Sequence, residues 1–159
     1  MSTPTYTLIN QVTLATTSAT VTFSSIPQSY VDLVLVVEGT LSVFDGVGVT
    51  FNGDASAAYP TVVMFAGTSP GSINYTGNEA AAGVLSTSRG NIVCSVFDYS
   101  AIDKHKTVVG RSGVADTQVR TTASRWTNTA SINRMSVNAA AGTRTFGVGT
   151  TFSLYGIVG

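Results

Sequence analysis

Hydrophobic and polar residues alternate along most of this chain, and β-branched residues are frequent where they alternate. The longest apolar run is residues 30–38, which read Tyr-Val-Asp-Leu-Val-Leu-Val-Val-Glu. Its odd-numbered positions from 31 to 37 are all apolar, and Asp32 is the one polar residue at the even-numbered positions between them. A strand that is apolar on both faces is covered on both faces, so we expect this segment at the centre of a sheet.

The same two-residue period, or a strand-forming composition, recurs along the rest of the chain. It predicts further strands at residues 6–14, 19–23, 47–51, 62–65, 91–99, 106–111, 117–126, 132–139 and 151–158. We expect residues 117–126 to form an outer strand, because the alternating side chains there are mostly Thr, Gln and Arg. Residues 67–83 are rich in Gly, Ser, Asn and Ala, and predict a long loop with at most one helical turn at 79–82.

About ten short strands without a credible helix indicate an all-β fold, and we predict a jelly-roll-like antiparallel β-sandwich with about four strands in each sheet. The length of 159 residues suits one domain. We assign residues 6–159 to this domain and residues 1–5 to an extended N-terminal arm. No internal repeat of ~20–50 residues is present, which disfavours a propeller or a solenoid.

Only 10% of the residues are charged, against about 25% in an average soluble domain. The surface must then consist largely of small polar residues, which favours a subunit of an assembly; a secreted β-domain is the alternative. No apolar run reaches ~18 residues, so we expect no membrane span. The first residues lack the basic and apolar regions of a signal peptide, which predicts synthesis in a cytoplasm.

Charge is divided unevenly between the two halves of the chain. Residues 1–88 contain five acids and no Lys or Arg, whereas residues 89–159 contain all eight bases and three acids. If the strands interleave, this division places opposite charges on neighbouring strands; otherwise it gives one acidic and one basic flank for head-to-tail packing. The net charge of zero and the scattered bases argue against nucleic-acid binding.

Candidate chemistry is sparse. His105 is the only histidine, and its Asp-Lys-His-Lys context is typical of a solvated strand start rather than a catalytic base, so we expect no enzyme and no cofactor. Cys94 stands alone on a predicted strand, where a cysteine usually behaves as a small buried hydrophobe. Asp54 follows Asn-Gly, and is either a calcium ligand together with Asp45 or Asn52 or part of an ordinary turn.

Two aromatic residues are candidates for binding sugar. Trp126, next to Arg125, is either a platform for a sugar ring or a cover for one end of the core, and we favour the core. Tyr75, in the predicted loop, is the more exposed candidate; the alternative is local packing or a subunit contact.

Three stretches together resemble a known family. They are residues 23–33 (Phe-Ser-Ser-Ile-Pro-Gln-Ser-Tyr-Val-Asp-Leu), 51–54 (Phe-Asn-Gly-Asp) and 151–157 (Thr-Phe-Ser-Leu-Tyr-Gly-Ile). This combination resembles small virion structural proteins of tailed bacteriophages and prophages, and residues 126–132 are similar to the Trp-centred segment of that family. Thr50 replaces the Arg that often precedes Phe-Asn-Gly-Asp there, which puts a salt bridge at that position in doubt.

The resemblance implies a β-sandwich on the virion surface, made in the cytoplasm of a host bacterium. The implied role is capsid decoration, or cement, by a homo-oligomer, with a trimer expected, that binds the major capsid protein. The alternative is a head-fibre or tail-fibre adhesin that binds host glycans. We expect the arm and the long loop to become ordered only against another chain. The residues expected to contact a partner are Ser2, Thr3, Pro4, Tyr6, Ser72, Asn74 and Tyr75.

Overall fold

The chain consists of β-strands joined by turns and short loops. A computed structural model describes residues 5–67, 69–115, 118–140 and 143–159, and within these ranges it contains no helix. The strands are β1 (Tyr6–Thr13), β2 (Thr20–Phe23), β3 (Asp32–Gly39), β4 (Asp45–Phe51), β5 (Tyr59–Gly67), β6 (Gly71–Gly77), β7 (Ala80–Leu85), β8 (Gly90–Phe97), β9 (Lys106–Val114), β10 (Gln118–Trp126), β11 (Met135–Ala139) and β12 (Thr151–Ile157).

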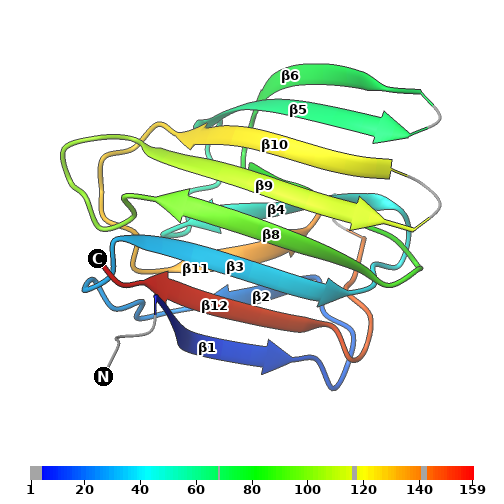
Figure 1. The fold of residues 1–159 in the computed structure, drawn as a ribbon, viewed down its shortest axis with the longest axis horizontal. Helices are drawn as coiled ribbons and strands as arrows, with labels where there is room; N and C mark the ends of the chain where they lie inside the picture. Colours follow the sequence, from blue (N-terminus) through cyan, green and yellow to red (C-terminus); the bar gives the residue numbers. More distant parts are fainter. Residues whose placement is uncertain (1–4, 68, 116–117, 141–142) are drawn as a thin grey trace.

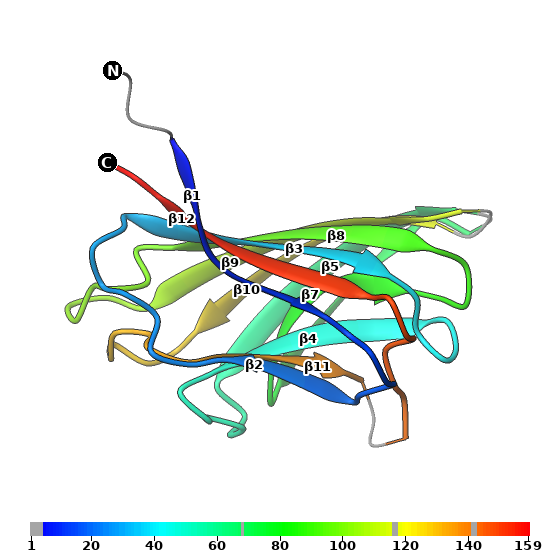
Figure 2. The same ribbon diagram turned by 90° about the horizontal axis from the view of Figure 1, so that it is seen from below.

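These strands form two antiparallel sheets that face each other as a β-sandwich (Figure 2). The larger sheet has eight strands in the order β1-β12-β3-β8-β9-β10-β5-β6, and Figure 1 shows it with β1 and β6 at opposite edges. The smaller sheet has four strands in the order β2-β11-β4-β7. The predicted all-β sandwich is confirmed. The sheets are unequal, however, and the jelly-roll connectivity is not confirmed by this strand order.

One hydrophobic core fills the space between the two sheets. Strand β3 lies inside the larger sheet, paired with β12 on one side and β8 on the other, as expected. Leu33, Leu35 and Val37 point into the core and are fully buried. On the opposite side of β3, Val34 is buried but Val36 is only half-buried. Our expectation that both faces are covered therefore holds only in part.

Residues 67–83 do not form the long loop that we predicted, because most of them lie in β6 and β7. Strand β6 pairs with β5 along its whole length, so ladder hydrogen bonds order it without an apolar pattern. Strand β7 is made of small residues because it packs tightly on β9. A Cβ atom on Gly110 of β9 would lie closer than 3.0 Å to the backbone carbonyl of Ala82.

Side chains of the larger sheet also bind the β7 backbone directly. Thr122 donates to the carbonyl of Ala81 over 2.6 Å, and Ser124 accepts from the Ala81 amide at 3.2 Å. Ser112 accepts from the amide of Val84 at 3.0 Å. These contacts explain why β10 is not the outer strand that we expected. It lies between β9 and β5, and two of its polar side chains turn inward to hold β7.

The start of β9 also differs from our expectation of a solvated segment. Lys106 is fully buried, and its Nζ donates to the carbonyls of Lys104 and Thr129 at 2.9 and 2.8 Å. Burial lowers the pKa of Lys106, because desolvation disfavours the charged form. Two backbone carbonyls therefore take the place of water around this ammonium group.

The uneven charge of the two halves has one local consequence. Arg144 Nε lies 2.9 Å from Asp45 Oδ2, so an acid of the first half pairs with a base of the second half. The other ion pair between described residues joins Lys104 and Asp98 at 3.5 Å, within the second half. The Asp45–Arg144 pair agrees with the interpretation that folding interleaves the two halves.

Candidate functional site

The residues predicted to contact a partner lie at opposite edges of the larger sheet. Tyr6 belongs to β1 and pairs with Ile157, so it is part of a strand and not of a free arm. Ser72, Asn74 and Tyr75 belong to β6, at the far edge of the sheet. The structure therefore does not bring the two groups together. Ser2, Thr3 and Pro4 lie outside the described residues.

Strand β6 is an edge strand that is open to solvent on both of its faces. Residues 71–76 are all exposed, and among the described strands β6 pairs only with β5. Side chains alternate along a strand, so Ser72 and Asn74 point to the outer face of the sheet, whereas Tyr75 points to the side of the smaller sheet. The loop that we expected is thus an exposed strand with two different surfaces.

A groove of about 490 Å³ crosses the larger sheet where β6, β5 and β10 meet. It is shallow and mainly apolar, with Arg125 at one end as its charged residue. The residues that line it are Pro60, Thr61, Val62, Asn74, Tyr75, Thr76, Ala123, Ser124 and Arg125.

A second groove, of about 470 Å³, lies between β6 and the smaller sheet, and it is more polar. Its walls carry Glu79, Asn138, Thr50 and Tyr75. The Asn138 amide donates to Glu79 Oε2 over 3.2 Å and to Thr50 Oγ1 over 3.4 Å. Glu79 lies flat on β4, because Gly48 has no side chain there; a Cβ atom would collide with the carboxylate.

The surroundings in this groove shift the pKa values of Glu79 and of Tyr75. Burial raises the pKa of Glu79, and the hydrogen bond from Asn138 opposes that rise. Burial also raises the pKa of Tyr75, with a further rise from the Glu79 charge and an opposing effect of Arg120. A carboxylate, an amide, a hydroxyl and one aromatic ring are groups that can hydrogen-bond and stack against a polyhydroxyl ligand.

Asp54 and Trp126 form a structural unit and not a binding platform. Trp126 is only 1% exposed, and its Nε1 donates to Asp54 Oδ2 over 2.8 Å. Ser56 donates its hydroxyl and its amide to Asp54 Oδ1 at 2.5 and 3.0 Å. These donors lower the pKa of Asp54, with the Ser56 hydroxyl as the largest cause. The prediction that Trp126 covers the core is confirmed. The carboxylate of Asp54, which the sequence offers as a calcium ligand, accepts hydrogen bonds from donors of the protein.

The turn that follows β4 holds the residues after Trp126 in place. Asn52 and Gly53 adopt positive φ angles of 53° and 77°, as an Asn-Gly turn requires. Asn52 Oδ1 accepts from the amides of Asn133 and Arg134 at 3.0 and 3.2 Å. Its Nδ2 donates to the carbonyl of Ser131 at 2.8 Å.

The Phe-Ser-Ser-Ile-Pro-Gln corner holds the same segment from the other side. Gln28 Nε2 donates to the carbonyls of Ile26 and Ile132 at 2.8 and 3.0 Å. The Tyr99 hydroxyl donates to the carbonyl of Pro27 and accepts from the amide of Tyr30. Sequence reasoning found these motifs but not their purpose, which is to fix one end of the sandwich.

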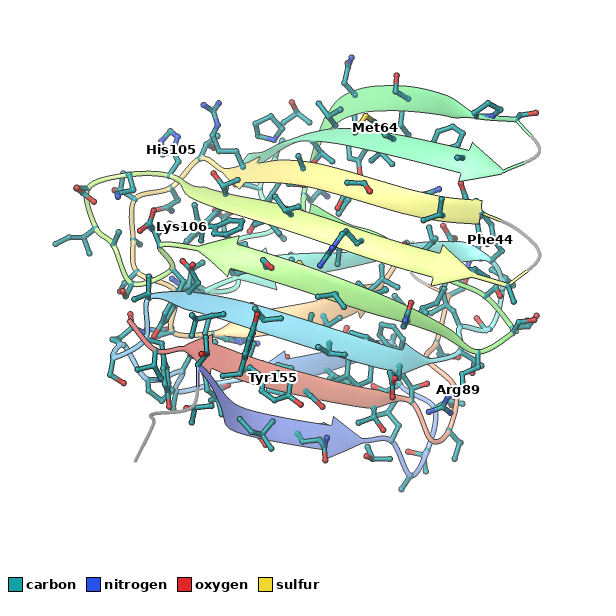
Figure 3. The ribbon with its side chains drawn as sticks, in the orientation of Figure 1. Phe44, Met64, Arg89, His105, Lys106 and Tyr155 are labelled. Atoms are coloured by element: carbon teal, nitrogen blue, oxygen red, sulfur yellow. The ribbon has the colours of Figure 1, made fainter. Side chains whose placement is uncertain are left out.

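The remaining candidate residues are separated from one another. His105 is exposed in the loop before β9 (Figure 3). Cys94 is fully buried, and burial raises its pKa to about 12, as expected for a small core residue. Among the described residues, no group of three or more His, Cys, Asp or Glu side chains is arranged to hold a metal ion. No helix in the described part of the chain is long and apolar enough to cross a membrane.

Comparison with known proteins gives no relative: the chain matches no protein-family model, no curated protein and no solved structure.

Proposed function

We propose that this chain is a virion structural protein of a tailed bacteriophage, a capsid decoration protein that stabilises the head by bridging capsid subunits. The proposal starts from the resemblance of three sequence stretches to such proteins. In the structure the first two stretches hold backbone segments through side-chain hydrogen bonds, and the third is β12, which pairs with β1 and β3. These are roles expected of motifs that specify a fold rather than a reaction.

The observation that carries the proposal is β6, an edge strand exposed on both faces. Exposed edges carry unpaired backbone groups, and a neighbouring chain can add a strand there. Such pairing buries backbone and side chains at a seam between subunits, and so raises the free energy needed to open the seam. The low charge of the surface suits a protein that is held against others. The N-terminal residues Ser2, Thr3 and Pro4 are proposed to make a second contact with the major capsid protein.

This function can be tested on particles that lack the protein. Deleting its gene from the phage that encodes it should give heads that release DNA at a lower temperature, measured by the fluorescence of a DNA-binding dye. Adding back purified protein should restore the release temperature. A Ser72→Pro variant should bind poorly, because proline disrupts strand pairing at the edge, whereas Ile102→Ser, in the exposed loop before β9, should bind normally. Unchanged DNA release in the deletion particles would refute the cement function.

A second candidate function is adhesion to host glycans, and the polar groove beside Glu79 favours it. Its carboxylate, amide and hydroxyl, with the ring of Tyr75 at its wall, match the groups that bind sugars. Binding of capsular or lipopolysaccharide glycans by the purified protein, abolished in Glu79→Ala and in Tyr75→Ala, would support this function. Retention of binding in both variants would exclude this groove as the glycan site.

A further inference from the structure

The outer face of the larger sheet carries many exposed apolar side chains and has no covering layer among the described residues. The smaller sheet packs on one side only, as Figure 2 shows. On the other side, large apolar side chains are exposed on β1, β8, β10 and β5, and so across most of the sheet. They include Tyr6 (56% exposed), Leu8 (50%), Val62 (48%), Met64 (57%), Phe97 (41%) and Val119 (57%).

Strand register places Leu8, Val62 and Met64 in two rows that cross the sheet and combine apolar with polar residues. One row crosses seven strands of the sheet, from β5 to β1, and contains Val62, Ala123, Val109, Ser95, Val34, Tyr155 and Leu8. The next row contains Met64, Thr121, Arg111, Val93, Val36, Ser153 and Gln11. Arg111 is the one charged residue in these two rows. Met64 and Tyr155, which Figure 3 labels, lie in opposite halves of this face.

The acids and the bases that lie on the strands of this face are on different strands. Its acids, Asp32 and Glu38, lie on β3, and its bases, Arg111 and Arg125, lie on β9 and β10. The midline of the sheet runs between β8 and β9, so the acids of these strands lie in one half and the bases in the other. Arg89, in the turn before β8, lies beside Glu38 in the first half. A surface of this kind is complementary to itself when a two-fold rotation places one half on the other.

We propose that this face binds a second copy of the chain in a two-fold, face-to-face dimer. A rotation axis along the strands, between β8 and β9, places β3 of one copy over β10 of the other, and β12 over β5. Asp32 then faces Arg125 of the second copy, because the two residues lie at the same end of the strands. Tyr155 faces Val62 of the second copy in the same way. Stacked sheets lie ~10 Å apart and cross at about 30°, so contacts near the midline are the best aligned.

The face is large enough for a stable dimer. Strands spaced ~4.8 Å apart make a sheet of eight strands ~34 Å wide, and a strand of eight residues is ~26 Å long. The product is roughly 900 Å² per copy, against ~800 Å² per partner in a standard stable interface. This is a substantial part of the accessible surface of 7635 Å².

The inference rests on the proposed function and deepens it, because it makes the homo-oligomer implied by the resemblance a dimer in place of the expected trimer. The dimer leaves the free edge and the inner face of β6 available to the capsid. The mass of the chain in solution and the temperature at which particles release DNA are separate measurements. A monomer that restores heat stability would refute this inference alone, whereas a dimer without effect on the particles would refute the capsid function alone.

Sedimentation velocity on the full chain at micromolar concentration tests the dimer. We expect twice the chain mass of 16.4 kDa. Ala123→Lys places an ammonium group in the middle of the interface, and should weaken association by at least about tenfold. Ala123 is exposed in one copy, so the variant should fold normally. Val148→Lys is the matched control, since Val148 is 65% exposed and lies before β12, outside the strands of this face.

A charge exchange tests the orientation of the two copies. Arg125→Asp should weaken the dimer by placing two acids opposite each other, and the double variant Arg125→Asp with Asp32→Arg should recover most of the affinity. Thermal melts of each variant report whether the fold is retained. A native chain that stays monomeric or has three times the chain mass overturns the proposal. So does an Ala123→Lys variant that is folded and still dimeric.

Discussion

Replacing Gly110 by alanine should destabilise the protein strongly, because β7 lies directly on β9 at this position. The added Cβ would approach the backbone carbonyl of Ala82 and the hydroxyl of Thr122 closer than 3.0 Å. A side chain can rotate away from such a contact, but a backbone carbonyl within a sheet cannot. Either β7 or β9 must therefore shift.

The magnitude follows from two contributions. Overpacking of a dense site costs about 1–3 kcal/mol. If β7 moves, it also loses hydrogen bonds such as those of Val84 with Ser112 and of Thr122 with Ala81, each contributing about 1 kcal/mol. The lower entropy of an unfolded chain with alanine offsets about 0.4–1 kcal/mol. We expect Gly110→Ala to lower the free energy of unfolding by about 2–4 kcal/mol.

Gly113→Ala is the matched control in the same strand. No atom of the described residues lies within 4 Å of the position that its Cβ would occupy. This variant should be neutral or slightly more stable, by up to about 1 kcal/mol, through the same effect on the unfolded chain. Urea denaturation followed by tryptophan fluorescence measures both variants. If Gly110→Ala is within about 0.5 kcal/mol of Gly113→Ala, β7 does not pack on β9 as described.

Three further predictions concern single side chains. Glu79→Gln should raise the melting temperature at pH 7 and have little effect at pH 4. Burial raises the folded-state pKa of Glu79, so the native protein loses stability as the pH rises from 4.5 through that pKa. A difference in melting temperature that does not depend on pH would contradict this origin. Lys106→Met should cost about 1–3 kcal/mol in urea denaturation, because it removes the donor that binds the carbonyls of Lys104 and Thr129. Unchanged stability would show that water replaces the ammonium group. Leu35→Asp should cost several kcal/mol and prevent cooperative folding, since its side chain is fully buried in the core; a soluble, cooperatively melting variant would disprove that placement.

Alternation along the chain predicts strands well where one face meets the core. Val47, Val49 and Phe51 alternate with polar or small residues, and all three are buried. On β8, Ile92 and Cys94 point inward as their spacing indicates. In each of these strands the hydrophobic period itself indicates which side chains are buried, so a single sequence is sufficient to predict the strand.

Strands that are stabilised by contacts with distant parts of the chain could not be predicted from their own residues. Strand β6 has no apolar period, because ladder bonds to β5 order it. Strand β7 is rich in Ala and Gly, because Gly110 and Ser112 of β9 approach its backbone. Such residues resemble a loop until their tertiary neighbours are known. For the same reason, Thr122 and Ser124 indicated an exposed strand, although they turn inward.

The sequence predicts which residues belong to the candidate site but not how they are arranged. Ser72, Asn74 and Tyr75 do lie on an exposed segment, yet the strand period points Tyr75 away from the other two. The partner of Glu79 could not be foreseen, because Asn138 lies far away in the sequence. The outer face had a visible signal, since Val34 and Val36 alternate with core residues and remain apolar.

Cryo-electron microscopy of intact virions tests the capsid function most directly. The chain should account for sandwich-shaped density on the outside of the capsid facets, over seams between capsid subunits, with β6 against the shell. Density for the chain at the tail end alone, or its absence from the particle, would contradict the capsid decoration function. The tail location would instead support adhesion through the groove beside Glu79.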